Sequence, residues 1–279
     1  MKRNKTSSEL KAMAKEQLLG NYGIAAGTFA ILYGIIFGVI MLVYMALLTS
    51  VIADSITGQP SAMAEMVSSP VYMAVSYFAS AVLGALISTL IVGYSNIALK
   101  IARGNKPKVS DLFYCYSHHP DKVIVVYLII YAVSFLLALP ALIVNFAMMG
   151  SGSSSGMTFL IWAVLYAAGL VLSVIFSMMI SQVYYLYIDY PQENAVNFIK
   201  QSILIMKGNK GRLFYMILSM FGWYLLIFVS CGIAAFWVIP YMTVTLSNFY
   251  RDLKGEFDSG PIVDAVIDDN TETNKIEQE

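Results

Sequence analysis

The chain has 279 residues, of which 58% are hydrophobic and 12% are charged, and its mean hydropathy is +0.70. Soluble proteins contain about 25% charged residues, so this composition excludes an ordinary soluble domain and indicates a membrane protein. The 17 Lys and Arg balance the 17 Asp and Glu, and their positions along the chain inform on topology rather than on partners.

Residues 1–22 are predicted to form a cytoplasmic amphipathic helix. Thr6 and Glu9 have the spacing of a capping box. Apolar residues then recur at helical spacing: Leu10, Met13, Ala14 and Leu18. We expect this apolar face to lie on lipid headgroups, with a solvated tail as the alternative, and Gly20–Asn21 to end the helix.

Six segments are predicted to span a membrane. In chain order they are residues 23–48, 71–99, 123–149, 158–188, 213–230 and 232–250. The last two come from one uncharged run, which as a straight helix would be about 57 Å long, roughly twice the hydrocarbon thickness. We therefore predict a helical hairpin that turns at residues 230–232. A cleaved signal peptide is the alternative for the first segment, but its apolar run is too long for one.

Charge decides the expected orientation. The 17 Lys and Arg all fall in segments that this topology places on one side, and the positive-inside rule makes that side the cytoplasm. Both termini are then cytoplasmic. The expected organisation is residues 1–22 as a surface helix, 23–254 as a six-span domain and 255–279 as an acidic, disordered tail. The fold class is an all-α polytopic membrane bundle.

Two further short cytoplasmic helices are expected, at residues 109–116 and 196–206. The second has an apolar face of Val196, Ile199, Ile203 and Met206. Gly-Asn recurs ahead of outward spans, at Gly20–Asn21, Gly104–Asn105 and Gly208–Asn209. Three repeated units would explain this. In the middle unit, however, Gly-Asn precedes the surface helix instead of following it, so a recurrence without repeats is the alternative.

No catalytic or cofactor site is expected. The spans contain no charged residue, and the chain has no phosphate loop, nucleophile elbow or Cys-x-x-Cys. His118 and His119 point apart on a helix and have no second ligand cluster, so we expect no metal. Pro140 and Pro240 would either bend helices or break them at a transport site. The basic loops follow from topology, so nucleic acid is not an expected partner.

The hairpin also resembles a known family. The resemblance lies in Met206–Lys207–Gly208–Asn209–Lys210–Gly211–Arg212, then in Gly222–Trp223–Tyr224, Gly232–Ile233 and Trp237–Val238–Ile239–Pro240–Tyr241. These residues are similar to the uncharacterised bacterial membrane family catalogued as domain of unknown function 975. The resemblance implies a polytopic protein of the bacterial cytoplasmic membrane, distantly similar to membrane domains attached to some glycerophosphodiester phosphodiesterases, and it brings no catalytic residue.

We therefore hypothesise a non-enzymatic membrane protein that binds or organises lipids or other membrane proteins through its cytoplasmic helices. The alternative is a permease or exporter of an apolar or amphipathic molecule, which Pro140, Pro240 and polar residues within the spans would serve. The candidate residues are those of the hairpin motif: Gly208, Asn209, Lys210, Arg212, Trp223, Gly232, Pro240 and Tyr241.

Overall fold

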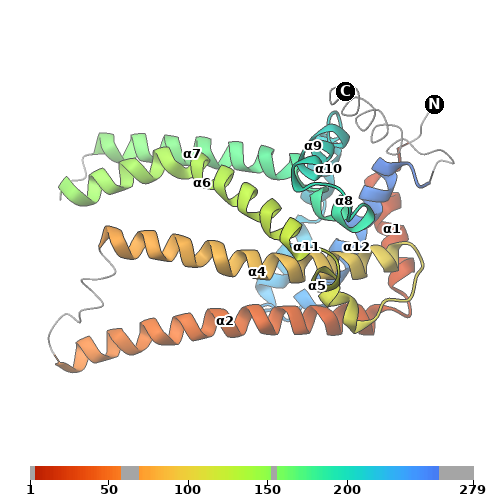
Figure 1. Ribbon diagram of the computed structural model, residues 1–279, viewed down its shortest axis with the longest axis horizontal. Coiled ribbons are helices and arrows are strands. Elements are labelled where there is room, and N and C mark those ends of the chain that lie inside the picture. Colours follow the sequence, from red (N-terminus) through yellow and green to blue (C-terminus); the bar gives the residue numbers. More distant parts are fainter. Residues whose placement is uncertain (1–3, 58–68, 152–155, 258–279) are drawn as a thin grey trace, which may run out of the picture. The chain divides into compact units, whose positions relative to one another are not determined.

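The computed structural model describes residues 4–57, 69–151 and 156–257, which are helical with short connecting turns and contain no strand (Figure 1). These residues belong to two compact units. The terminal unit comprises Met1–Ala26, Ser95–Asp111 and Ile175–Glu279, and the central unit comprises Gly27–Tyr94 and Leu112–Val174. The predicted acidic tail beyond residue 257 lies outside the described residues, as do residues 58–68, between the first two predicted spans, and residues 152–155, between the third and fourth.

The long helices are those expected to cross a membrane. They are α2 (Tyr22–Thr57), α4 (Pro70–Ala102), α6 (Pro120–Ser151) and α7 (Gly156–Met179). Within the described residues, five segments are long and apolar enough to span a bilayer: Tyr22–Met45, Ala74–Ala102, Pro120–Met148, Gly156–Asp189 and Lys210–Val229. The 20 residues of α12 (Ala235–Lys254) supply the length of a sixth, about 30 Å. The predicted all-helical fold with five to six helices of spanning length is confirmed.

Exposed apolar surfaces are present on the long helices. Large apolar side chains such as Leu42, which is 74% exposed, and Leu160 point outward along them. Such a surface suits hydrocarbon rather than water. Pro140 lies inside α6 without interrupting it, so of the two expectations for this residue the break is wrong.

The N-terminal helix α1 (Ser7–Leu18) begins as predicted. The Thr6 hydroxyl accepts the Glu9 backbone N–H, and the Glu9 carboxylate accepts the Thr6 backbone N–H, which completes the capping box. Its apolar face, however, does not lie open for headgroups. Leu10, Ala14 and Leu18 are buried, and α1 packs along α12. That expectation is corrected: α1 is part of the terminal unit's core, because α12 presents an apolar face of its own.

Two predicted spans are interrupted. The fourth divides into α7 and α8 (Val183–Asp189), and the fifth divides into α10 (Lys210–Leu218) and α11 (Phe221–Val229). At each break a serine bonds a carbonyl three residues earlier: the Ser181 hydroxyl donates to Met178 O at 2.9 Å and the Ser219 hydroxyl to Met216 O at 2.6 Å. Such local bonds compete with the helical ladder, and they explain how an uncharged run can contain two helices.

The predicted surface helices are present with one change. Residues 109–116 form η1 (Val109–Phe113) and most of α5 (Tyr114–Ser117), and the helix predicted at residues 196–206 is α9 (Ala195–Ile205). On α9 the buried residues are Phe198, Gln201 and Ser202, whereas Val196 of the predicted apolar face is exposed. Packing against α8 decides this, since Tyr187 and Phe198 make an edge-to-face ring contact.

The Gly-Asn pairs mark helix ends. Gly20, Gly104 and Gly208 all have positive φ, which favours glycine after a helix. Asn21 donates to Gln17 O at 3.0 Å, and Asn209 donates in the same way to Ile205 O at 3.1 Å. The first and third pairs thus share one local geometry, with a short helix before them and an apolar helix after them.

Candidate functional site

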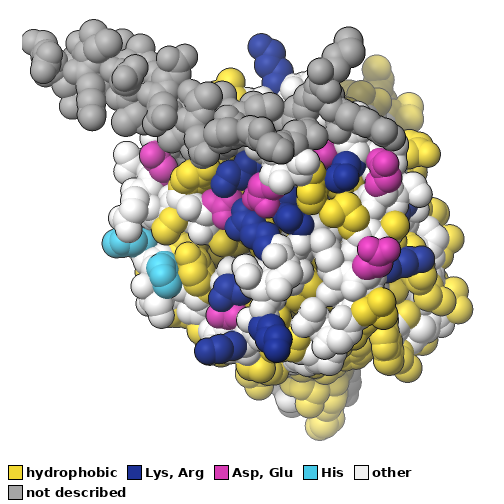
Figure 2. Space-filling model, turned by 90° about the vertical axis from the view of Figure 1, so that its right-hand side faces the viewer, with side chains coloured by type: hydrophobic (Ala, Val, Ile, Leu, Met, Phe, Trp, Pro, Cys, Tyr) yellow, Lys and Arg dark blue, Asp and Glu magenta, His cyan; other side chains and the backbone are white. Residues whose placement is uncertain are grey.

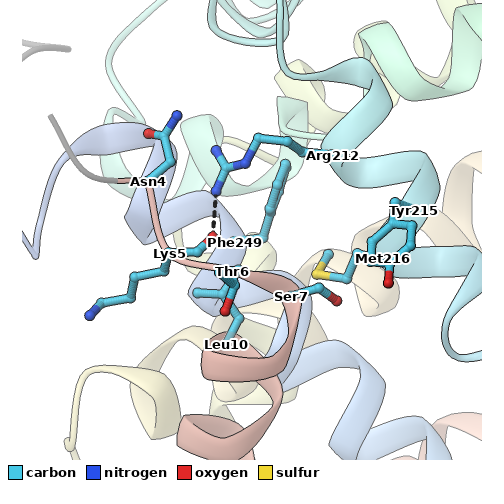
Figure 3. A pocket seen from close by; sticks show the side chains of 9 residues that line it. All are labelled: Asn4, Lys5, Thr6, Ser7, Leu10, Arg212, Tyr215, Met216 and Phe249. Atoms are coloured by element: carbon cyan, nitrogen blue, oxygen red, sulfur yellow. Dashed lines mark hydrogen bonds between the residues drawn. The ribbon is translucent and has the colours of Figure 1, made fainter.

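The predicted motif residue Arg212 lies in the first turn of α10 and reaches Lys5, which precedes α1 (Figure 3), and Asn209 lies just before α10. Arg212 donates to Asp252 Oδ2 at 2.5 Å, to Lys5 O at 2.9 Å and to Asn209 Oδ1 at 3.2 Å. The Lys5 backbone N–H donates to Asp252 Oδ1 at 3.1 Å. Asp252 is only 2% exposed, so this cluster fixes α10, α12 and the chain before α1 to one another.

A hollow of about 300 Å³ opens beside this cluster. Figure 3 shows Arg212, Tyr215 and Met216 of α10 on one side of it and Thr6 and Ser7, where α1 begins, on another. The Arg212 guanidinium also lies over the Phe249 ring, 5.4 Å from its centroid. The lining residues are Asn4, Lys5, Thr6, Ser7, Leu10, Arg212, Tyr215, Met216 and Phe249. Because Arg212 is already bound by Asp252, this hollow offers little free charge to a ligand.

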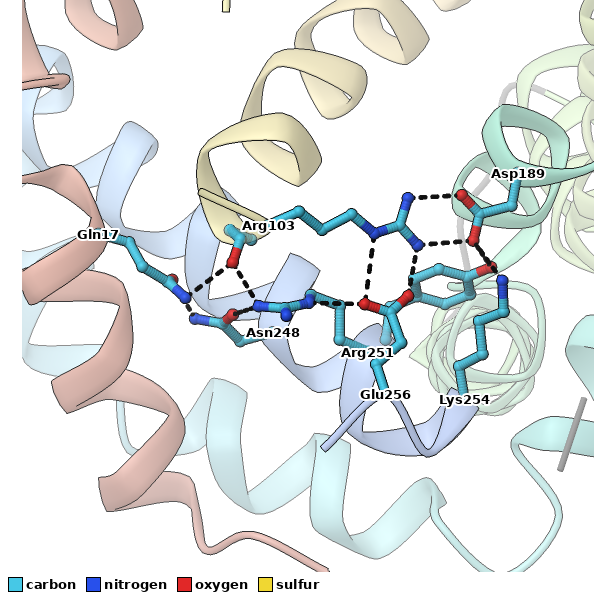
Figure 4. A network of polar contacts seen from close by, with 9 residues as sticks. Gln17, Arg103, Asp189, Asn248, Arg251, Lys254 and Glu256 are labelled. Carbon is cyan, nitrogen blue, oxygen red and sulfur yellow. Dashed lines mark hydrogen bonds and ion pairs between the residues drawn. The ribbon is translucent and has the colours of Figure 1, made fainter. Parts of the chain in front are cut away.

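A second polar network ties α4, α8 and α12 together (Figure 4). Arg103 pairs through two nitrogens with the Asp189 carboxylate, at 2.7 and 2.8 Å. Asp189 also accepts the Lys254 ammonium at 3.0 Å and the Tyr250 hydroxyl at 2.9 Å. Arg103 pairs with Glu256 as well. Figure 2 shows basic and acidic side chains lying together on one face.

The network continues from Arg251 to α1 through three uncharged groups: the Ala102 carbonyl and the side-chain amides of Gln17 and Asn248. Arg251 binds Glu256 at 2.8 Å and donates to the Ala102 carbonyl. Gln17 of α1 donates to the same carbonyl at 2.8 Å, and Asn248 donates to Gln17 Oε1 at 2.7 Å. The last carbonyl of α4, that of Ala102, is therefore satisfied by side chains of α1 and α12.

Electrostatics keep these groups charged. Burial alone would lower the pKa of Arg103, but hydrogen bonds and charge from Asp189 and Glu256 raise it. Burial would likewise lower the pKa of Lys254, and Asp189 outweighs it so that the pKa is raised. For Glu256, burial opposes ionisation, yet hydrogen bonds from Arg103 and Arg251 lower its pKa. Each of the three cations and two carboxylates of this network is paired with an opposite charge, an arrangement that holds helices together.

The predicted residues Trp223 and Tyr241 meet in an aromatic pocket of about 220 Å³. Their rings make an edge-to-face contact with centroids 5.7 Å apart. The pocket is lined by Lys15, Tyr22, Trp223, Trp237, Val238 and Tyr241. Trp237 is 59% exposed and Trp223 is 38% exposed, whereas Val238 and Tyr241 are buried. The pocket therefore has an apolar floor, an open aromatic rim and one lysine.

The aromatic pocket takes its lining from four elements. Lys15 comes from the last turn of α1 and Tyr22 is the first residue of α2, while Trp223 belongs to α11 and Trp237 to α12. Within the described part of the chain, no carboxylate forms an ion pair with Lys15. The pocket can thus hold a group that is apolar over most of its surface and negatively charged at one point.

A model of the family described as "Protein of unknown function (DUF975)" matches residues 1–256. The chain belongs to this family. No curated protein and no solved structure matches the chain. In this DUF975 protein the aromatic pocket and both polar clusters lie within the matched residues.

The remaining motif residues of the DUF975 chain lie in turns, at a helix start or inside a helix. Gly208, with φ +82°, lies in the turn between α9 and α10, and Lys210 begins α10. Gly232 has φ +89° in the turn between α11 and α12, as the hairpin prediction requires. Pro240 is buried inside α12 without breaking it. None of these four residues lines either hollow.

Sequence reasoning missed the partners of the motif residues. Lys15 and Trp237 line the aromatic pocket, and Asp189 and Asp252 hold the two polar clusters. A signal existed for Asp189, because it is an isolated carboxylate at the end of a long uncharged run. Across the described residues, no group of three or more His, Cys, Asp and Glu side chains is arranged to hold a metal.

Proposed function

We propose that this protein is a non-enzymatic integral protein of the bacterial cytoplasmic membrane that binds anionic phospholipid and thereby organises lipid on the cytoplasmic side, where both termini lie. The observation that carries the proposal is the aromatic pocket, in which Lys15 stands beside Tyr22, Trp223, Trp237 and Tyr241. Its occupant is a phospholipid whose phosphodiester pairs with Lys15 and whose glycerol and upper acyl region lie on the tryptophan rings.

The position of the pocket along the chain supports a lipid as the occupant. Lys15 and Glu16 are the last charges before the long uncharged run that begins at Gln17 and continues to Ala53, near the end of α2. The pocket therefore lies where the chain passes from water to hydrocarbon. Trp and Tyr are enriched at that boundary because their rings are apolar and their N–H and O–H groups are polar. A lysine there attracts anionic headgroups by about 1 kcal/mol.

The size of the pocket also favours part of a lipid over a complete small molecule. Sites for drug-sized ligands usually enclose about 300 to 1,000 Å³ and bury most of the ligand. The aromatic pocket holds about 220 Å³, and its tryptophans are exposed to the surroundings. A headgroup-glycerol region fits that volume, and the acyl chains extend along the exposed apolar side chains of α11, such as Leu225 and Phe228.

Lipid retention tests the proposal. Native mass spectrometry of the protein in mild detergent should show bound phosphatidylglycerol in preference to phosphatidylcholine. Replacing Lys15 by glutamine should lower phosphatidylglycerol retention about fivefold, the equivalent of the ~1 kcal/mol of one lysine–headgroup interaction. Trp237→Ala should lower retention of both lipids, because it removes one rim of the pocket.

Matched controls lie outside the pocket. Lys200→Gln removes an exposed lysine of α9, and Phe159→Ala removes an exposed aromatic ring of α7, which belongs to the central unit and not to the unit that holds the pocket. Both controls should retain lipid as the wild type does. Equal loss of lipid in Lys15→Gln and Lys200→Gln would show that general charge, and not the pocket, attracts the lipid.

A permease is the second candidate, favoured by three buried polar atoms. Within the described residues, Asn96 Nδ2, Gln182 Oε1 and Gln201 Oε1 have no hydrogen-bond partner. Such atoms are costly to bury and would suit a polar path. Flux of an amphipathic solute in proteoliposomes that is lost in Gln182→Leu would favour the permease over the organiser.

A further inference from the structure

Lysines of α1 lie against the hairpin formed by α10, α11 and α12. The Lys11 ammonium donates to the Ser219 carbonyl at 3.2 Å and to the Ser219 hydroxyl at 2.5 Å. Ser219 is the residue at which α10 ends, so its carbonyl has no helical partner and accepts the lysine instead. Partial burial lowers the pKa of Lys11, as expected for an ammonium group packed against another helix.

This contact belongs to a series along α1. The chain before α1 is bound to Asp252 near the end of α12 through the Lys5 backbone N–H. Lys11 then meets the break between α10 and α11, and Lys15 meets Trp223 and Trp237 in the aromatic pocket. The charged face of α1 therefore lies along the hairpin, from the end of α12 at Asp252 to the level of Trp223 and Trp237.

The depth of Ser219 follows from the charge on Lys11. Ser219 lies near the middle of the Lys210–Val229 segment, which by length and composition alone could cross a bilayer. If this segment crossed, Ser219 would lie near the bilayer centre and would hold the Lys11 ammonium there. A charged group at that depth is among the most costly to insert. The Lys11 contact therefore places Ser219 at the cytoplasmic interface, with α1.

Only the far part of the hairpin remains for the hydrocarbon. Beyond Ser219 lies α11, whose 9 residues extend about 14 Å, roughly half of a 30 Å core. The chain then turns and returns along α12 to Tyr241, which is again level with Tyr22 in the aromatic pocket. The most exposed apolar side chains of the hairpin are at this turn, where Phe228 is 83% exposed and Val229 is 78% exposed.

The composition and hydrogen bonding of the turn between α11 and α12 suit an apolar environment. The turn carries no charged residue, and its backbone N–H groups are bonded internally: Cys231 to Phe228 O, Gly232 to Ile227 O, Ile233 to Ser230 O and Ala234 to the Ser230 hydroxyl. Non-helical backbone at membrane depth requires such internal partners because lipid supplies none. A turn in external water would not need them.

From these contacts we infer that the hairpin of α10, α11 and α12 enters the inner leaflet from the cytoplasmic side and turns back within the bilayer, so that its surface contacts the acyl chains of that leaflet alone. The hairpin therefore occupies volume in the inner leaflet and none in the outer leaflet. The four long helices still give an even number of crossings, so both termini remain on one side. This inference goes beyond the lipid pocket, and either can hold without the other.

Cys231 at the turn allows a direct test. The chain has two cysteines, Cys115 and Cys231, and Cys115 is buried. In intact cells producing the Cys115→Ala protein, a membrane-impermeant maleimide added outside should leave Cys231 unlabelled. The positive control is Ser154→Cys with both native cysteines replaced by alanine, since the sequence predicts residue 154 to be external. Peptide mapping of the labelled wild-type protein covers the case in which Cys115→Ala does not fold.

A nitroxide attached to Cys231 gives the depth. Its electron paramagnetic resonance signal should show frequent collisions with oxygen and few with a water-soluble nickel chelate, as expected near the bilayer centre. Labelling of Cys231 from outside at the rate of the Ser154→Cys control, or free access of the external nickel chelate, would overturn the inference. Phospholipid retention in the aromatic pocket is measured separately, so failure of one proposal is distinguishable from failure of the other.

Discussion

Replacing Gly93 by alanine is expected to prevent the central unit from folding normally. A Cβ atom at residue 93 would lie 1.8 Å from the Leu112 carbonyl oxygen and 2.5 Å from its carbonyl carbon. These are backbone atoms, which cannot rotate away as a flexible side chain would. Leu112 is fully buried, so the segment that contains it must move as a whole. Small residues allow this kind of close backbone approach between membrane helices.

The expected cost of Gly93→Ala is at least about 4 kcal/mol, in the range of the most severe single substitutions. Thermal unfolding in detergent, followed by size-exclusion chromatography, should show a much lower midpoint or no folded peak. Gly34→Ala is the matched control, because a Cβ there meets nothing within 4 Å, and alanine favours a helix more than glycine does. Equal unfolding midpoints for Gly93→Ala and wild type would contradict the close contact with Leu112.

Asp252→Asn is expected to be the second most damaging change. The buried Asp252 carboxylate accepts both the Arg212 guanidinium and the Lys5 N–H. Asparagine keeps the shape but removes the charge and directs an NH2 group toward one of these two donors. Breaking one side of a buried ion pair costs about 3 to 5 kcal/mol. Because the same cluster fixes α10 to α12 and to the start of α1, the whole terminal unit should loosen.

Limited proteolysis together with thermal unfolding measures this effect. In Asp252→Asn, cleavage after residues of α1 and α10 should become faster, and the unfolding midpoint should fall. Glu16→Gln serves as the control, since Glu16 is an exposed carboxylate of α1 and isolated surface charges contribute little. If Asp252→Asn resists protease as the wild type does, the Arg212 pair does not hold the terminal unit together.

Local signals in the sequence predicted much of the fold. The capping box of Thr6 and Glu9 predicted the start of α1, and Gly20–Asn21 predicted its end, because both depend only on neighbouring backbone geometry. The hairpin turn at Gly232 was predicted for the same reason. Trp223 and Tyr241, singled out from the family resemblance, lie together in the aromatic pocket.

Local sequence signals could not predict contacts between segments that are distant in the chain. Arg103 and Asp189 are separated by 86 residues, and Lys5 and Asp252 by 247 residues, and no spacing rule connects them. Hydropathy also cannot show the break at Ser219, because the residues on both sides are apolar and the break depends on a side-chain bond. The packing of α1 on α12 was missed because an apolar face fits lipid and protein equally well.

Tryptophan fluorescence tests the lipid-binding claim most directly. The chain has three tryptophans, and Trp162→Phe leaves only Trp223 and Trp237, both in the aromatic pocket. In phosphatidylcholine vesicles, brominated phosphatidylglycerol should quench this emission with about fivefold higher apparent affinity than brominated phosphatidylcholine, and Lys15→Gln should abolish the difference. Equal quenching by the two lipids, unchanged by Lys15→Gln, would contradict an anionic phospholipid site in this pocket.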